Sequence, residues 1–236
     1  MISKLIEVAR RDGPAAEEYR QTFLFETQDD DATVATALRE LNERSVLTDV
    51  DGNQAEPIRW QCSCLQRKCG SCAMVVNGTP RAACDVRLAR LRGRKVTLEP
   101  LRKFPVVADL VVDRHAVYDR LREAEVWLRD NVELPEGKRG SVAYEASRCL
   151  QCGCCLEVCP NFSTQGSFGG MAAMVPLSRL LAETAGADRD RLVASYRKAV
   201  HAGCGTSLAC RNVCPAEIDI AGLMARSNAA ILWRLR

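Results

Sequence analysis

Apolar and polar residues alternate in short runs in the first part of the chain, a pattern typical of β-strands. The runs at residues 5–10 (LIEVAR) and 19–25 (YRQTFLF) are rich in β-branched and aromatic side chains, and residues 95–101 (KVTLEPL) predict a last strand. Asn77 and Gly78 form the residue pair that favours a two-residue hairpin turn. The first part of the chain is therefore expected to contain a sheet.

Helical spacing occurs once in this first part and dominates the second part. Residues 31–45 predict a helix that Asp31 or Thr33 caps, with an apolar face made by Val34, Leu38 and Leu41. Further helices are expected over residues 115–131, 169–183, 188–203 and 220–236. In the first of these the apolar side carries Val117, Leu121, Val126 and Leu128. Pro176 starts or kinks the second, and Gly203 ends the third.

The 13 cysteines add to this picture, because an odd number cannot form a closed set of internal disulfides. The start of the chain lacks the apolar core of a signal peptide, and no stretch approaches about 18 apolar residues. We therefore expect a soluble chain in a reducing compartment, where clustered cysteines more often bind metal than form disulfides.

Other chemical signals are sparse. The net charge of +3 is modest and no nucleic-acid-binding motif accompanies it, so no nucleic-acid partner is expected. The chain has neither a dinucleotide-binding glycine motif nor a phosphate-binding loop, and its two histidines lie in no nucleophile motif. We expect no catalytic residue in this chain.

The first group of cysteines has the spacing of a plant-type [2Fe–2S] site. Cys64, Cys69 and Cys72 follow the order C-x4-C-x2-C, and Cys84 comes after the hairpin turn. We expect Cys64 and Cys69 to bind one iron, and Cys72 and Cys84 to bind the other. Small residues such as Gly70 are expected to let backbone N–H groups approach the cluster.

The other two groups together resemble the motifs of two-cluster ferredoxins. Residues 148–160 (RCLQCGCCLEVCP) contain C-x2-C-x2-C-x3-C-P, in which three cysteines bind the local cluster and the fourth binds the other cluster. Residues 204–215 (CGTSLACRNVCP) end in the matching Cys-Pro pair. This exchange predicts a [4Fe–4S] cluster held by Cys149, Cys152, Cys155 and Cys214. It leaves a [3Fe–4S] cluster with the ligands Cys159, Cys204 and Cys210.

Three residues of these groups have no assigned cluster. Cys62 and Cys154 are expected to be small buried apolar residues, with a ligand swap or a redox role as the alternative. Ser207 lies where a regular motif has a middle cysteine, so it either fills space at the open corner of the third cluster or binds iron. Structural zinc is the alternative for all the groups, but zinc needs four ligands and the third set has only three thiolates.

The strand and cysteine patterns together predict an α+β fold with two domains. Residues 1–105 are expected to form a β-grasp, plant-type [2Fe–2S] ferredoxin domain. Residues 106–236 are expected to form an α-helical, bacterial-ferredoxin-like domain with the other two clusters. The segment 102–114 (RKFPVVADLVVDR) is expected to cross between the domains.

At this point the chain resembles the iron–sulfur subunit of succinate dehydrogenase and fumarate reductase, the succinate:quinone oxidoreductases. The resemblance covers nearly the whole chain and rests on KCGSCAMVVNG (68–78), PLRKFPVVADLVVDR (100–114), RCLQCGCCLEVCPNF (148–162) and ACRNVCP (209–215). It implies three clusters in the order [2Fe–2S], [4Fe–4S], [3Fe–4S].

The resemblance also implies partners and a place in the cell. Electrons would pass between FAD in a flavoprotein subunit and a quinone at a membrane anchor that can carry haem b, with menaquinone expected in a bacterial host. The chain would lie at the cytoplasmic face of the cell membrane, or at the matrix face in a mitochondrion. Two alternatives remain: the cluster subunit of another flavin-linked reductase, and a free multi-cluster electron carrier, although carriers are usually smaller and strongly acidic.

Some residues depart from the family or have two interpretations. Members of the family often have a Trp or Lys near the third cluster for the quinone, but residues 159–168 contain no Trp and residues 214–220 contain no Lys. His201 either tunes the third cluster or relays a proton, or it is a helix-end histidine. The basic run Arg87–Lys95 is a solvated face or a docking surface. Packing roles are expected for Trp60, Trp127 and Trp233, the last with a membrane anchor as its alternative contact.

Overall fold

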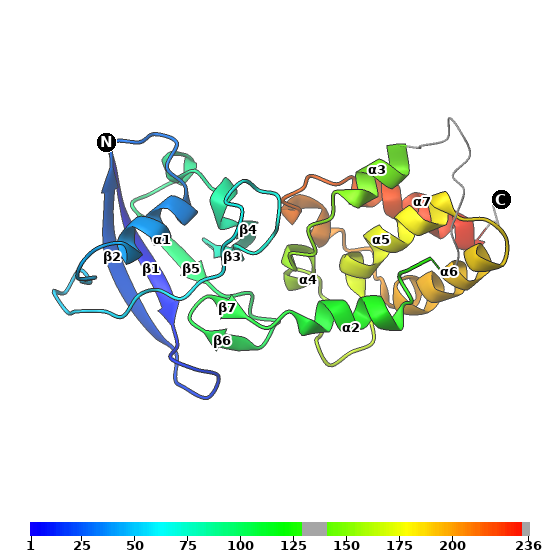
Figure 1. Cartoon of the computed structure of the whole chain (residues 1–236), viewed down its shortest axis with the longest axis horizontal. Coiled ribbons are helices and arrows are strands. Elements are labelled where there is room, and N and C mark those ends of the chain that lie inside the picture. The colour runs from blue at the N-terminus through cyan, green and yellow to red at the C-terminus, as the bar shows by residue number, and fades with distance from the viewer. Residues whose placement is uncertain (129–140, 233–236) are drawn as a thin grey trace. The chain divides into compact units, whose positions relative to one another are not determined.

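A computed structural model describes residues 1–128 and 141–232 (Figure 1). The chain divides into two compact units, Met1–Asp113 and Arg114–Arg236. The described strands belong to the first unit, and the described part of the second unit is helical. The α+β class expected from the sequence is confirmed.

The first unit is built on a mixed sheet of five strands in the order β2-β1-β5-β3-β4. The strands are β1 (Ile2–Arg10), β2 (Tyr19–Thr27), β3 (Ala73–Val76), β4 (Thr79–Ala82) and β5 (Lys95–Glu99). β1 is antiparallel to β2 and parallel to β5, while β3 is antiparallel to both β4 and β5. The alternating apolar residues of the central strands are fully buried: Ile6, Val8, Val96 and Leu98. The strands predicted near 5–10, 19–25 and 95–101 are therefore confirmed.

Helix α1 (Val34–Asn42) belongs to the same core, as its apolar spacing predicts. Thr33 caps its start: the Thr33 hydroxyl accepts the backbone N–H of Thr36 at 3.1 Å, and the Thr36 hydroxyl accepts the backbone N–H of Thr33 at 3.1 Å. The predicted face is confirmed, because Val34, Leu38 and Leu41 have no exposed surface. Of the two expected caps, Thr33 is the one that forms.

The predicted hairpin turn at Asn77 and Gly78 is confirmed. Both residues have positive φ angles, 48° and 75°, as a type I′ turn requires. The Asn77 side-chain oxygen also accepts the backbone N–H of Thr97 in β5 at 2.8 Å. The turn between β3 and β4 is thereby held to a third strand of the sheet. Two short 3₁₀ turns follow β4, η1 (Ala83–Asp85) and η2 (Leu88–Arg90).

Residues 102–114, which are expected to cross between the domains, also have a fold of their own. This segment contains a second, two-stranded sheet of β6 (Val106–Ala108) and β7 (Val111–Val112). Asp109 at its tip is buried, and its carboxylate accepts hydrogen bonds from Arg10 Nε at 3.1 Å and from the backbone N–H groups of Arg11 and Arg59 at 2.9 and 2.8 Å. These contacts make the hairpin part of the first unit. The units accordingly divide after Asp113, later than the expected boundary at residue 105.

The second unit is a helical assembly around α5. Its helices are α2 (His115–Glu123), α3 (Ser141–Ser147), α4 (Cys154–Glu157), α5 (Gly170–Glu183), α6 (Gly186–Ala199) and α7 (Ile220–Leu232), with the 3₁₀ turns η3 (His201–Gly203) and η4 (Ala209–Val213). α5 contacts α3, α6 and α7, as its central place in Figure 1 shows. The core between them includes Met174, Leu177, Leu192 and Tyr196, all without exposed surface.

Several helix ends differ from the predictions. α2 ends at Glu123 because Glu125 takes a left-handed backbone with φ 48°, so Val126 and Leu128 lie beyond the helix. Pro176 lies inside α5 and does not start it. α6 ends at Ala199, and η3 continues the chain to Gly203.

Parts of two predicted helices, residues 129–131 and 233–236, lie outside the described residues, and Trp233 is among them. Within residues 1–128 and 141–232, no helix has both the length and the apolar character needed to cross a membrane.

Candidate metal centres

The first group of cysteines gathers at one end of the five-stranded sheet. Cys72 lies just before β3 and Cys84 lies in η1, and the β3–β4 hairpin returns the chain so that the two sulfurs are 3.4 Å apart. A backbone hydrogen bond of 3.0 Å from Ala83 N to the Cys72 carbonyl fixes this return. Cys64 and Cys69 lie in the loop before β3.

The loop that carries Cys64 and Cys69 is wound so that its backbone N–H groups face sulfur. Its left-handed residues are Leu65, Arg67 and Gly70, with φ angles of 52°, 57° and 74°. The N–H groups of Gln66 and Lys68 donate to Cys64 Sγ at 3.3 and 3.4 Å, and that of Arg67 donates to Cys84 Sγ at 3.2 Å. Such donors were expected near Gly70, but the observed N–H groups lie earlier in the loop.

The thiols of this loop are suited to metal binding, which requires thiolates. Hydrogen bonds from Ser71, followed by those from Cys64, lower the pKa of Cys69 to about 6. Burial raises the pKa of Cys72 to about 12. Cys69 is thus ready to ionise at neutral pH, whereas Cys72 needs the positive charge of a bound metal, which deprotonates a coordinating thiol. The four residues fit an iron–sulfur group.

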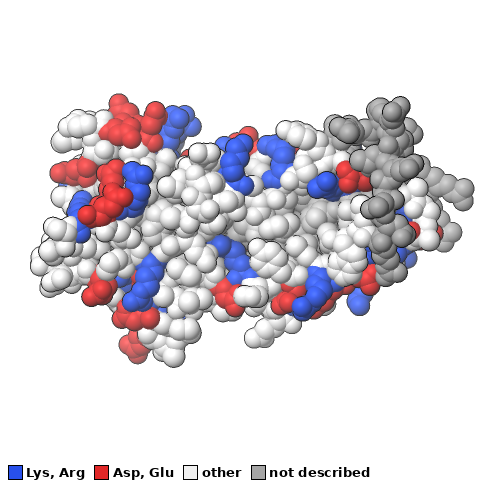
Figure 2. Space-filling model, in the orientation of Figure 1, with Lys and Arg blue, Asp and Glu red and all other residues white. Residues whose placement is uncertain are grey.

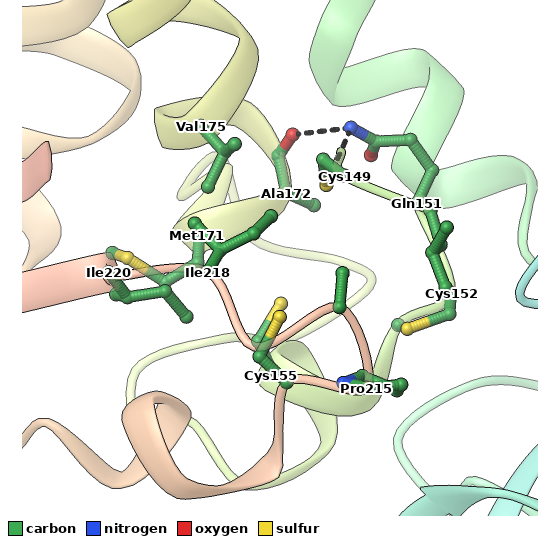
Figure 3. A pocket seen from close by; sticks show the side chains of 14 residues that line it. Cys149, Gln151, Cys152, Cys155, Met171, Ala172, Val175, Pro215, Ile218 and Ile220 are labelled. Atoms are coloured by element: carbon green, nitrogen blue, oxygen red, sulfur yellow. Dashed lines mark hydrogen bonds between the residues drawn. The ribbon is translucent and has the colours of Figure 1, made fainter. Parts of the chain in front are cut away.

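The second predicted set of cysteines surrounds one pocket in the second unit. Cys149, Cys152, Cys155 and Cys214 all line it, and Figure 3 shows the first three around the same space. Gly153, with φ 89°, turns the chain sharply between Cys152 and α4, which carries Cys155. Cys214 comes from the far motif and follows η4. The sequence motifs at 148–160 and 204–215 therefore meet at this pocket.

Apolar side chains complete the walls of this pocket. Met171 and Val175 come from α5, Ile218 lies just before α7, and Ile220 is the first residue of α7 (Figure 3). Burial raises the pKa of Cys149 to about 11. Cys152 is buried and the other three cysteines are half-buried, and the potential of a bound cluster depends on such burial.

The third predicted set is also brought together. Cys159 follows α4, Cys204 follows η3 and Cys210 lies in η4, which packs against α4. Burial, and after it the charges of Cys159 and Cys204, raise the pKa of Cys210 to about 11. The side chain of Ser207 is exposed. Among the described residues, no three His, Cys, Asp or Glu side chains converge tightly enough to hold a single metal ion.

The two unassigned cysteines differ in their surroundings. Cys62 is exposed, so the expectation that it is a buried apolar residue was wrong: it lies in the open loop before Cys64. Cys154 has no exposed surface, which confirms that expectation. The neighbouring Cys152 and burial raise the pKa of Cys154 well above its usual value.

Other singled-out residues lie at the surface or beside the core. Trp60 packs against the core of the first unit, as expected, but Trp127 is 45% exposed and does not have the expected packing role. In the basic run, Arg87 pairs with Asp31 at 3.0 Å, and Lys95 pairs with Glu7 at 2.7 Å. Figure 2 shows side chains of both signs interspersed over the first unit on the visible face. His201 lies in η3, two residues after the end of α6.

Sequence reasoning missed one polar residue at the second pocket. The side-chain nitrogen of Gln151 donates to Cys149 Sγ at 3.4 Å and to the Ala172 carbonyl at 3.2 Å (Figure 3). A signal for this contact exists in the sequence, because Pro176 follows Ala172 by four residues and cannot donate to its carbonyl. That signal identifies a free acceptor but not the donor that reaches it.

The first unit is β-grasp-like and brings four thiols together. The helical unit contains two interlocked sets of cysteines. Together these features define a multi-cluster iron–sulfur protein. Residues 5–119 match the family model of a 2Fe-2S iron-sulfur cluster binding domain, and residues 145–218 match that of a 4Fe-4S dicluster domain. Both domain types expected from the sequence are confirmed.

Comparison with individual proteins identifies the family. The chain is 36% identical over 205 residues to the succinate dehydrogenase iron–sulfur subunit of Bacillus subtilis, covering 83% of this chain and 79% of that protein. It is 32% identical over 181 residues to the fumarate reductase iron–sulfur subunit of Mycobacterium tuberculosis, covering 71% of each. The chain belongs to the family of succinate dehydrogenase and fumarate reductase iron–sulfur subunits, which confirms the resemblance noted in the sequence.

A solved structure has the same fold. A chain of the Mycobacterium smegmatis Sdh1 complex in the apo form superposes with a TM-score of 0.78 at 22% identity, covering 99% of this chain and 97% of that one. The likeness extends over both units and shows the fold of the chain.

Proposed function

We propose that this chain is the electron-transfer subunit of a succinate dehydrogenase or fumarate reductase complex. It relays electrons between FAD in a flavoprotein subunit and a quinone at a membrane anchor, and it lies peripherally at the membrane face that carries the flavoprotein. The observation that carries the proposal is the second pocket, where cysteines of two distant motifs meet in a family member. The chain itself converts no substrate.

Three ligand sets follow from the arrangement of the thiols. The [2Fe–2S] cluster is held by Cys64, Cys69, Cys72 and Cys84. The [4Fe–4S] cluster is held by Cys149, Cys152, Cys155 and Cys214. The [3Fe–4S] cluster is held by Cys159, Cys204 and Cys210. Each cluster, when bound, supplies a centre that gains and loses one electron.

The protein residues hold the thiolates and control their surroundings. In the first unit, three backbone N–H groups donate to cysteine sulfur at 3.2–3.4 Å and stabilise its negative charge. In the second unit, apolar side chains from α5, from the segment before α7 and from the start of α7 surround the thiols. Hydrogen bonding and burial are the features by which a protein sets cluster potentials.

The third set supports a cluster with an open corner. Three thiolates are available and the side chain of Ser207 is exposed, which favours a [3Fe–4S] cluster over iron ligation by serine. The expected sign is the EPR signal of an oxidised [3Fe–4S] cluster at low temperature. Its absence from the oxidised complex would contradict the three-thiolate set.

Cys214→Ala tests the second ligand set in the complex isolated from membranes. We expect this variant to lose the [4Fe–4S] EPR signal and to keep the [2Fe–2S] signal, because only the second unit is altered. Cys154→Ala is the matched control, since it removes a buried thiol beside the same pocket that is not a proposed ligand. A full [4Fe–4S] signal in Cys214→Ala would overturn the assignment.

The role in electron transfer is tested with the native complex. The tagged chain is recovered from gently solubilised membranes, flavin is measured in the eluate, and succinate is added before EPR. We expect flavin to accompany the chain and succinate to reduce the clusters. Clusters that dithionite reduces but succinate leaves oxidised, in an eluate without flavin, would contradict the proposed partner and substrate while leaving the clusters in place.

A further inference from the structure

Gln151 lies between two of the cysteines that line the second pocket, and its backbone is left-handed with φ 51°. Its side-chain nitrogen points at Cys149 Sγ, 3.4 Å away, as the dashed line in Figure 3 shows. Gln151 therefore directs its side-chain N–H at the thiol of a neighbouring cysteine.

A proline in the neighbouring helix fixes the orientation of this side chain. Pro176 has no N–H, so the Ala172 carbonyl one turn earlier in α5 lacks its usual helical donor. The side-chain nitrogen of Gln151 donates to that carbonyl at 3.2 Å. Because a carbonyl oxygen only accepts hydrogen bonds, the nitrogen end of the amide must face Ala172 and, with it, Cys149. The donor assignment thus follows from chemistry.

The oxygen end of the Gln151 amide makes no hydrogen bond to the described part of the chain in this position. The Gln151 Oε1 atom is buried and has no hydrogen-bond partner among the described residues. An unsatisfied buried acceptor is unfavourable, so its placement needs an opposing gain. A hydrogen bond to an ionised sulfur is about twice as strong as one between neutral groups. The geometry is therefore favourable when Cys149 is a thiolate, which is its state as a cluster ligand.

We propose that Gln151 is a positioning residue that raises the reduction potential of the [4Fe–4S] cluster, an inference that rests on the ligand set proposed above. Reduction adds negative charge to the cluster and its thiolates. An N–H donor stabilises the more negative state by more than the less negative one, and hydrogen bonds to cluster sulfur are known to set potentials. The apolar walls from Met171 and Val175 strengthen this interaction by lowering the local dielectric.

Redox titration of the membrane-derived complex, monitored by EPR, tests the inference. Gln151→Leu keeps a side chain of similar size and removes the donor. We expect the equilibrium constant for one-electron reduction of the [4Fe–4S] cluster to fall about tenfold, which is a midpoint lower by ~59 mV. The [2Fe–2S] midpoint is expected to stay the same, because that cluster lies in the other unit.

Two further variants make the titration specific. Gln165→Leu is the matched control: it makes the same chemical change at an exposed glutamine of the same unit, and its midpoints are expected to equal those of the wild type. Gln151→Glu has nearly the shape of the natural residue and, when ionised, cannot donate. It is expected to lower the [4Fe–4S] midpoint as well, and it serves if the leucine variant does not assemble.

The outcomes separate this inference from the proposed function. A wild-type [4Fe–4S] signal with unchanged midpoints in both Gln151 variants overturns the role of Gln151 and leaves the ligand set intact. The role of Gln151 is also overturned, with the ligand set left intact, if Gln165→Leu shifts the [4Fe–4S] midpoint as much as Gln151→Leu does. A wild-type complex without any [4Fe–4S] signal contradicts the ligand set itself, and both conclusions then fall together.

Discussion

Replacing Asp109 with asparagine removes one charge from the ion pair with Arg10, in which both side chains are buried. The side chains of Arg10 and Asp109 are 1% and 0% exposed. The Asp109 carboxylate accepts three hydrogen bonds, from Arg10 Nε at 3.1 Å and from the backbone N–H groups of Arg11 and Arg59 at 2.9 and 2.8 Å. Arg59 lies shortly before the loop of Cys64 and Cys69, so this carboxylate also anchors the approach to the first cluster site.

The expected loss is large because a buried positive charge is left without its partner. Asparagine has the same shape as aspartate and tolerates the left-handed backbone of this position, φ 45°, so the substitution adds little strain. Removing one member of a buried ion pair typically costs about 3–5 kcal/mol. Arg10 retains acceptors in the Gln21 side chain and in the carbonyl groups of Glu56 and Pro57, which places the estimate at the lower end, about 3 kcal/mol.

Urea unfolding of the whole chain, followed by the visible circular dichroism of the [2Fe–2S] site, measures this loss in the first unit. Since the free energy of unfolding of small domains falls by about 1–3 kcal/mol per molar urea, a loss of about 3 kcal/mol lowers the midpoint by at least ~1 M. Asp12→Asn is the control, because Asp12 pairs with Arg59 at 3.7 Å and is 63% exposed. Its expected effect is under ~1 kcal/mol. Equal midpoints for the two variants would refute the reasoning.

Three further substitutions have expected outcomes of different kinds. Thr33→Ala removes the cap of α1 and should lower the free energy of unfolding by about 1 kcal/mol in urea; an unchanged midpoint would show that the cap is dispensable. The hydrogen bond from Arg102 holds the pKa of Glu18 below its usual 4.5, so this carboxylate stabilises the fold above that pH and ceases to do so as the pH falls through the lowered value. Glu18→Gln should therefore lessen the drop in melting temperature on acidification, and an equal drop would contradict the ion pair's role. Gly153→Ala forces a side chain to φ 89°, at about 1–2 kcal/mol, and should reduce [4Fe–4S] content measured as iron per chain; normal content would show that the turn adapts.

Local patterns predicted much of the fold because their signals lie in neighbouring residues. The spacing of Val34, Leu38 and Leu41 is enough to define one face of α1, and the Asn77-Gly78 pair is enough to define the hairpin turn. The cysteine spacing likewise predicted that Cys149, Cys152 and Cys155, which are close in sequence, lie around one pocket.

Features that depend on distant contacts were not predictable in this way. The β6–β7 hairpin forms because Asp109 reaches Arg10, which lies almost a hundred positions earlier, as the sequence separation of 99 shows. The end of α2 depends on a left-handed Glu125, and its sequence neighbours give no turn signal. Gln151 meets α5 only once the helical unit has folded. Each of these features requires knowledge of which segments pack together.

The pocket lined by Cys149, Cys152, Cys155 and Cys214 sets an order of events during synthesis of the protein. Its first three thiols emerge from the ribosome well before the fourth, with α5 and α6 between them. A cluster delivered to the nascent chain would meet an incomplete set of ligands. With Cys214 as the fourth ligand, as proposed above, insertion of the [4Fe–4S] group would wait until translation has passed residue 214, whereas the loop and hairpin of the first unit could be loaded while the helical unit is still being made.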